Sequence, residues 1–183
     1  LSSSSAASDV YKRQDANGLK FRVQNSEVLK AQMAALGGSP QPMAFSEVYG
    51  ALQTGVVDGQ ENTWSNIYGK KFFEVQDGTT ETNHGIIDYL LVTSTDWWDG
   101  LDGEIRDQLS TIIAEVTEAR NSESTAVNEA AKQEIIAAGG VVRQLSAAQR
   151  ENWVATMKPV WEQFRSDVGQ DNIEAAQAIN AKH

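Results

Sequence analysis

Three side chains within the first 62 residues could together recognise a small carboxylate. Arg22 lies in an alternating apolar and polar stretch, and its planar guanidinium can pair with both oxygens of a carboxylate, which a lysine cannot do. Phe45 precedes a predicted helix, and Asn62 follows a glycine turn, where its amide offers one acceptor and two donors. None of the three is a nucleophile or a metal ligand, so the set indicates binding rather than catalysis.

Each of these residues also has an ordinary structural explanation. Arg22 could form a surface salt bridge, Phe45 could be a core aromatic residue, and Asn62 could cap the helix that follows it. Spacing alone leaves both explanations open for each residue.

A catalytic alternative would use the carboxylates of Asp58 and Glu61 with the imidazole of His84 for acid–base chemistry. No further residue completes such a constellation, and the sequence has no G-x-S-x-G elbow and no phosphate-binding loop. The acidic turn at 96–104 lacks the spacing of a calcium loop. Since there is no cysteine, thiol catalysis and Cys-based metal sites are excluded. We therefore expect no enzymatic activity, no cofactor and no metal.

Composition narrows the class of partner. The chain has 183 residues, 40% of them hydrophobic, only 3 prolines and a formal net charge of -10. This composition argues against global disorder, and the negative charge disfavours binding to nucleic acid or anionic lipid. A small anion can still bind where one buried arginine sets the local field. A ligand-free interaction module remains a further alternative.

The elements that would position the three side chains follow from periodicity and capping signals. Alternating apolar residues predict strands, and the small polar residues before apolar stripes predict helix N-caps. The expected order is a strand at 19–24, a helix capped by Asn25 or Ser26, an extended stretch at Pro40 and Pro42, a helix at 47–54 capped by Ser46, and a strand ending at Val57. This order predicts an α/β layer with parallel strands. In such sheets ligands bind beyond the carboxyl ends of the strands, where Phe45 would lie.

The second half of the chain is dominated by a predicted long helix. No Gly or Pro interrupts 104–138, and a helix of that length would run about 50 Å. Such a helix exceeds one small lobe, so it must either bend or span two lobes. Before it, 85–93 reads as a buried strand, and after it 141–145 reads as another strand.

Two helices are expected after 145. Ser146 and Gln149 form a capping box before a helix with an aromatic stripe, and Pro159 should kink that helix. Asp171 or Asn172 should cap the last helix.

Three stretches carry a resemblance to a known family. They are FRVQNSEV, ALGGSPQPMAFSEVYGALQTGVVDGQENTWSNIYGKKFFEV and TNHGIIDYLLVTS, and together they resemble the substrate-binding proteins of TRAP transporters, specifically the C4-dicarboxylate-binding branch. The resemblance covers about residues 15–180. It implies a two-lobed α/β fold of the type II periplasmic-binding-protein class, with the long helix running across both lobes. It also implies a periplasmic protein that traps an organic anion and delivers it to a sodium-driven membrane permease.

The resemblance assigns roles to particular residues. Arg22 matches the arginine that pairs with the ligand carboxylate, Phe45 the aromatic residue packed on the ligand, and Asn62 the asparagine that hydrogen-bonds the same carboxylate. Trp64 sits where the branch has an aromatic residue or a proline, and it completes the expected set of ligand-binding residues. The implied ligands are malate, succinate or fumarate, with sugar acids and monocarboxylates as alternatives, and the implied protein partners are the TRAP permease subunits.

The expected domain organisation has three parts. The serine-rich stretch 1–14 reads as a non-native leader, such as translated adapter sequence. The resemblance implies that 15–93 form the ligand-binding lobe, equivalent to the C-terminal lobe of the family. Residues 94–183 would supply the inter-lobe helix, a return strand and the C-terminal helices, and most of the N-terminal lobe would be absent.

Overall fold

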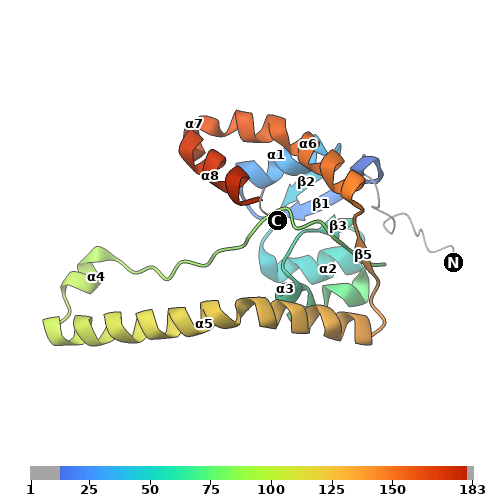
Figure 1. The fold of residues 1–183 in the computed structure, drawn as a ribbon. Coiled ribbons are helices and arrows are strands. Elements are labelled where there is room, and N and C mark those ends of the chain that lie inside the picture. The colour runs from blue at the N-terminus through green and yellow to red at the C-terminus, as the bar shows by residue number, and fades with distance from the viewer. Residues whose placement is uncertain (1–12, 181–183) are drawn as a thin grey trace.

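The fold is built on a small parallel sheet in the computed structural model, which describes residues 13–180 (Figure 1). The strands are β1 (Lys20–Val23), β2 (Ser39–Pro42) and β3 (Gly59–Gln60), in the spatial order β2-β1-β3. All pairing is parallel, and Arg22 of the central strand lies opposite Gln41 on one side and Gln60 on the other. The predicted α/β layer with parallel strands is therefore confirmed.

Helices connect these strands. The first connection is α1 (Glu27–Ala35), where Ser26 Oγ accepts from the Leu29 N–H at 3.4 Å, as the sequence predicted. Gly37 follows it at a φ of 83°, a left-handed conformation that suits glycine. The second connection consists of the 3₁₀ turn η2 (Phe45–Glu47) and α2 (Val48–Gln53).

Two predicted details of the second connection were wrong. Ser46 does not cap a helix, because it lies inside η2; the turn begins after Ala44, whose N–H donates to the Glu47 carboxylate at 3.3 Å. The third strand does not end at Val57. The Val57 side chain is buried in the core, and the ladder with β1 begins only at Gly59.

The core consists of two clusters. The larger one lies among α2, α3 (Trp64–Gly69), the 3₁₀ turn η3 (Phe72–Val75) and the end of α5, and its buried members are Val48, Ala51, Leu52, Val57, Ile67, Phe72 and Ile135. The smaller one joins the 3₁₀ turn η1 (Arg13–Ala16), β1, α1 and α6, and its buried members are Ala16, Val23, Met33 and Leu36.

The long helix predicted at 104–138 is confirmed as α5 (Gly103–Ala137). Asp102 caps it by accepting from the Glu104 N–H at 2.9 Å. Its buried residues, Ala131 and Ile135, lie near the C-terminal end, where the helix packs against α3. The N-terminal part extends away from the rest of the protein and ends beside α4 (Thr95–Asp99) (Figure 1). No helix within residues 13–180 is long and apolar enough to cross a membrane.

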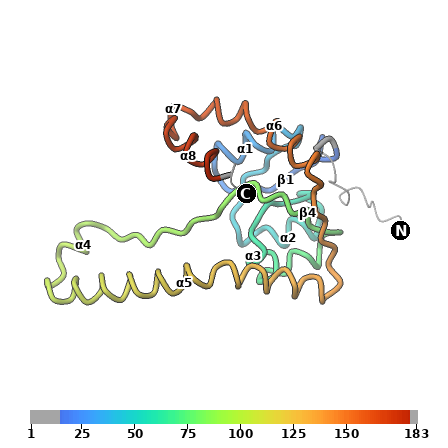
Figure 2. The backbone as a smooth tube through the Cα atoms, viewed as in Figure 1, coloured from blue at the N-terminus to red at the C-terminus, as the bar shows by residue number. Residues whose placement is uncertain are grey.

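The buried strand predicted at 85–93 was wrong. This segment runs as extended chain between the body and α4 (Figure 2), and its apolar side chains are exposed, with Ile86 at 88% and Leu90 at 85%. A strand needs a hydrogen-bonded neighbour, and none of the described residues pairs with 85–93. The nearby ladder instead joins β4 (Thr79–Glu81) to β5 (Val142–Gln144), which confirms the strand predicted at 141–145.

The C-terminal helices cover α1 on the side away from α5 (Figure 1). The capping box of α6 (Ala147–Gln163) is confirmed: Ser146 Oγ accepts from the Gln149 N–H at 3.3 Å, and the Gln149 side chain accepts from the Ser146 N–H at 2.8 Å. The helix continues past Pro159, and the expected kink stays a prediction.

The predicted cap of the last helix was wrong. Gly169, at a φ of 89°, ends α7 (Arg165–Val168). The next helix, α8 (Gln170–Asn180), therefore begins before Asp171 and Asn172. Residues 1–12 of the expected leader lie outside the described residues.

Candidate ligand-binding site

A cleft of about 690 Å³ opens at the carboxyl ends of β1 and β2. Its polar lining residues are Arg22, Gln24, Asn25, Asn62, Asn66 and Tyr89, and its apolar ones include Met43 and Phe45. The position agrees with the expectation that ligands bind beyond the carboxyl ends of parallel strands. The fold thus brings together three of the four residues singled out from the sequence, Arg22, Phe45 and Asn62.

Arg22 supplies a buried positive charge to this cleft. The residue is 2% exposed, and its Nε and Nη2 donate to the carbonyl oxygen of Met43 at 3.1 and 2.9 Å. Its Nη1 is buried and donates to none of the described residues. Burial lowers the pKa of Arg22, and the negative charge of Glu61 acts in the opposite direction. The guanidinium is therefore held in place on one side and retains unused donors on the other.

Phe45 joins the cleft to the larger core cluster. Its ring makes an edge contact with Phe72, with the ring centroids 5.7 Å apart. The guanidinium carbon of Arg22 lies 5.7 Å from the ring centroid, and Lys70 Nζ lies at the same distance. The aromatic face of Phe45 thus favours the positive charge of Arg22, and the edge-to-face contact with Phe72 holds the ring in place.

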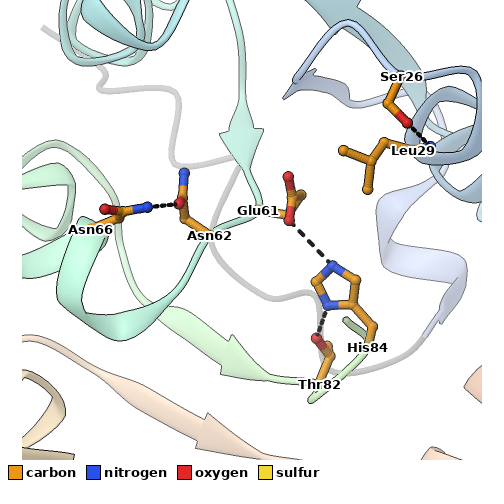
Figure 3. Close-up of polar contacts among 7 residues, drawn as sticks. All are labelled: Ser26, Leu29, Glu61, Asn62, Asn66, Thr82 and His84. Atoms are coloured by element: carbon orange, nitrogen blue, oxygen red, sulfur yellow. Dashed lines mark hydrogen bonds and ion pairs between the residues drawn. The ribbon is translucent and has the colours of Figure 1, made fainter. Parts of the chain in front are cut away.

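Asn62 lies between β3 and α3, where Thr63 caps the helix by accepting from the Asn66 N–H at 3.3 Å. The side-chain Nδ2 of Asn66 donates to Asn62 Oδ1 at 2.6 Å (Figure 3) and to the Tyr89 hydroxyl at 3.3 Å. The Asn62 carbonyl oxygen therefore already has a partner, and its Nδ2 donates to none of the described residues.

Trp64 is placed differently from the other three residues. It does not belong to the cleft lining but packs against the larger core cluster. Lys132 Nζ of α5 lies 5.6 Å from its ring and forms an ion pair with Glu81 at 2.9 Å. The structure thus connects Trp64 to the long helix rather than to the cleft.

The residues of the catalytic alternative are only partly brought together. Glu61 Oε2 lies 3.4 Å from His84 Nε2, and His84 Nδ1 lies 2.6 Å from Thr82 Oγ1 (Figure 3). Asp58 is engaged elsewhere, because it accepts from the Lys20 N–H at 2.8 Å. Within residues 13–180, no group of three His, Asp or Glu side chains could hold a metal ion.

Sequence reasoning missed four polar residues of the cleft: Gln24, Asn25, Asn66 and Tyr89. The first two directly follow β1, so the position of Arg22 could have indicated them. Asn66 lies four residues after Asn62, a spacing that brings side chains together around the start of a helix. Tyr89 gave no usable signal, because it lies in the segment mistaken for a buried strand.

Comparisons with known proteins add independent findings. Residues 1–167 match the family of bacterial extracellular solute-binding proteins, family 7. The C4-dicarboxylate-binding periplasmic protein DctP of Vibrio cholerae serotype O1 is 64% identical over 168 residues, which are 92% of this chain and 51% of that protein. The chain thus spans about half the length of the curated relatives that it matches.

Solved structures give the same result. A TRAP periplasmic solute-binding protein from Shewanella oneidensis with bound succinate superposes with a TM-score of 0.90 at 45% identity, covering 93% of this chain and 56% of that one. A TRAP periplasmic solute-binding protein from Pseudomonas aeruginosa PAO1 with bound L-malate gives a TM-score of 0.83 at 41% identity, covering 86% and 55%. The mixed α/β fold, including α5, therefore matches these structures over about half of their length.

Proposed function

Because this chain belongs to the bacterial extracellular solute-binding proteins of family 7, we propose that it is part of a receptor for a C4-dicarboxylate. One observation carries the proposal. The buried guanidinium of Arg22 has a nitrogen, Nη1, that donates to none of the described residues, and Arg22 lines a cleft together with Phe45 and Asn62. A small carboxylate is the ligand that such a group of donors fits.

In the proposed mode of binding, Arg22 holds one carboxylate. Its Nε and Nη2 stay on the Met43 carbonyl, which fixes the plane of the guanidinium, while Nη1 remains for the ligand. The free Nδ2 of Asn62 adds a second donor, and the ring of Phe45 excludes water from one side. Excluding water strengthens the ion pair, because the effective dielectric constant falls. Trp64 supports the site by fixing the start of α3 against α5.

Two observations support dicarboxylates as the ligand class. The similar proteins from S. oneidensis and P. aeruginosa hold succinate and L-malate. The cleft also offers polar groups beyond those that one carboxylate needs, including Gln24 and Tyr89. We assign these groups to the remainder of the ligand.

The proposal extends to the whole receptor. We infer a two-lobed periplasmic protein of type II, in which 15–93 belong to the ligand-binding lobe and 94–183 supply the inter-lobe helix, the return strand and the C-terminal helices. In support, the chain covers 51% of the V. cholerae relative, which is periplasmic by name, and much of α5 has no packing partner among the described residues. A receptor of this kind would deliver its anion to TRAP permease subunits.

Binding is best tested on a protein of the length of the relatives. This chain is joined to the part of the V. cholerae relative that it does not cover, and the hybrid is titrated calorimetrically with succinate, L-malate, fumarate, glucuronate and acetate. Tight binding of the C4-dicarboxylates supports the proposal. Preference for glucuronate or acetate would show that the ligand is a sugar acid or a monocarboxylate rather than a C4-dicarboxylate. A hybrid that folds but gives no heat and no melting shift with any of the acids would overturn the receptor function.

A further inference from the structure

We propose that Asn66 is a positioning residue that sets the direction of the Asn62 amide, so that Asn62 presents donors rather than an acceptor to the ligand. The inference rests on the proposed function, since it concerns how the same cleft selects an anion. It starts from a property of asparagine: the two ends of its amide have nearly the same shape but opposite hydrogen-bonding character. Whatever fixes the direction of Asn62 therefore decides whether its contact with an anion is attractive.

Asn66 is hydrogen-bonded directly to the Asn62 amide. Its Nδ2 carries two hydrogens and donates to two acceptors, Asn62 Oδ1 at 2.6 Å and the Tyr89 hydroxyl at 3.3 Å. Its backbone is held as well, because its N–H donates to the Thr63 side chain at the start of α3. The Tyr89 hydroxyl and the Asn62 amide can each donate or accept, so the amides of Asn62 and Asn66 turn over together. Asn62 Oδ1 is engaged, and its Nδ2 is left for the ligand, only while Asn66 directs Nδ2 at it.

The consequence is a group of donors around the cleft. With Oδ1 engaged by Asn66, Asn62 is left with its two Nδ2 hydrogens, and Tyr89, which accepts from Asn66, keeps its hydroxyl hydrogen available. Arg22 Nη1 adds a further donor. All four residues line the same cleft, so its polar groups are set for an acceptor-only ligand such as a carboxylate.

Asn66→Asp reverses this arrangement with a minimal change of shape. A carboxylate at position 66 accepts only, so the Asn62 amide turns over to donate to it and directs Oδ1 at the ligand. The new negative charge also repels an anion directly, and Asn25→Asp serves as the matched control for that effect. Asn25 lines the same cleft and, among the described residues, is not hydrogen-bonded to Asn62, so Asn25→Asp adds the charge without an acceptor that would turn the amide.

Affinity for succinate is measured in the hybrid described above, in which this chain is joined to the part of the V. cholerae relative that it does not cover. We expect Asn66→Asp to bind at least about tenfold more weakly than Asn25→Asp, because one misdirected hydrogen bond to a charged group costs that much or more. Asn66→Leu, which removes the directing donor without reversing it, should fall between the parent hybrid and Asn66→Asp. Equal losses in Asn66→Asp and Asn25→Asp would overturn the inference.

A second measurement does not depend on ligand binding. In ¹⁵N NMR spectra of the ligand-free hybrid, the Asn62 side-chain amide is assigned by its disappearance in Asn62→Leu. We expect Asn66→Asp to shift the Asn62 amide protons downfield, because they then donate to a carboxylate, and Asn25→Asp to leave them in place. An unmoved resonance in Asn66→Asp would overturn the inference even if the affinities differ. If the parent hybrid folds but binds no acid, the proposed function fails while this spectrum still decides the role of Asn66.

Discussion

Arg22 is buried, charged and only partly hydrogen-bonded, a combination that costs a folded protein free energy. The direction of its pKa shift expresses that cost. Burial lowers the pKa of Arg22 below its value in the unfolded chain, so its charged form opposes folding at every pH below the folded pKa. Since arginine remains protonated across the physiological range, the cost is constant there. A bound carboxylate acts as Glu61 does, in the opposite direction, and so couples binding to stability.

Changing Arg22 to Lys tests whether geometry or charge holds the ligand. Lysine keeps the positive charge but cannot donate to Met43 and to a carboxylate in one plane. We expect succinate affinity in the hybrid to fall by about 2–5 kcal/mol, the usual result of removing one partner from a buried charged pair. Calorimetric titration measures this loss.

Lys70→Gln is the matched control, because it removes a charge at the same distance from the Phe45 ring but at an exposed position. We expect a loss of less than about 1 kcal/mol for that variant, as for exposed charges in general. If Arg22→Lys lost as little affinity as Lys70→Gln is expected to lose, positive charge rather than guanidinium geometry would hold the ligand.

The constant charge of Arg22 leads to a prediction about pH. Saturating succinate at about 100 times its dissociation constant should stabilise the hybrid by about 2.7 kcal/mol. Because Arg22 and the dicarboxylate both keep their charges between about pH 7 and 9, this gain should not change over that range. Thermal melts with and without succinate at several pH values measure it. A gain that declines within the range would show that a titrating group other than Arg22 controls binding.

Among the elements, α5 holds the start of α3 and thereby the Asn62–Asn66 pair. Asn128 Oδ1 of α5 accepts from the Ser65 N–H at 3.1 Å. One turn further on, the Lys132 ammonium lies over the Trp64 ring and pairs with Glu81 of β4. The side chains of Lys132 and Glu81 are only 12% and 19% exposed, so solvent screens this pair less than a surface pair. A helix that otherwise projects from the body is thus attached beside the cleft.

Lys132→Met tests this attachment. The substitution keeps much of the side-chain volume but leaves the Glu81 carboxylate largely buried without its cation. We expect the free energy of unfolding to fall by about 1–3 kcal/mol, below the roughly 3–5 kcal/mol typical of a fully buried pair. Urea unfolding of the hybrid measures the change.

The pair between Lys30 and Glu27 on α1, whose side chains are 28% and 75% exposed, provides the more solvent-screened control. Lys30→Met should change the free energy of unfolding by less than about 0.5 kcal/mol, as for other i,i+3 pairs on helices. If Lys132→Met were equally mild, the contacts of Lys132 would contribute nothing to the attachment of α5.

Elements whose determinants are local could be predicted from the sequence. Ser26 and the Ser146–Gln149 box each act within one helical turn, and α5 needed only an uninterrupted helical stretch. The cap at Asp171 or Asn172 was wrong because Gly169 let the helix begin earlier. The strand at 85–93 was wrong because a strand depends on a neighbour, which the apolar pattern of one segment does not provide.

The same distinction applies to the site. The chemistry of Arg22 suited either a carboxylate ligand or a surface salt bridge, and its burial in the structure argues against the surface position. The link from Asn66 to Tyr89 was out of reach, because it joins residues far apart in the sequence through a segment with no regular structure. Trp64 was expected in the ligand-binding set, but the structure places its ring beside Lys132 of α5. The sequence could not predict this contact, because it depends on where α5 packs.

In the whole molecule, an unpaired apolar segment and an exposed helix extend from one side of the body (Figures 1 and 2). The segment's exposed apolar side chains are Ile86, Tyr89, Leu90, Leu91 and Val92, and α5 adds Ile105, Ile112 and Val116. Contiguous apolar surface of this kind marks an interaction site or a tendency to associate. Because the chain spans about half of its relatives, we assign this surface to contacts with the remainder of the receptor.

This assignment predicts how the 183-residue chain behaves alone. It should bind the dye anilinonaphthalene sulfonate and self-associate, because the apolar side chains of 85–93 are exposed to solvent. We expect this despite the repulsion between chains that carry a net charge of -10. Replacing Leu90 and Leu91 by serine should remove most of the dye signal. Replacing Val154 and Val168 by serine should leave it unchanged, since those exposed residues lie singly on the C-terminal helices. Adding the remaining part of the V. cholerae relative as a separate protein should also lower the signal. A dye-silent, monomeric, sharply melting chain would contradict the assignment, because it would show that 85–93 is already covered.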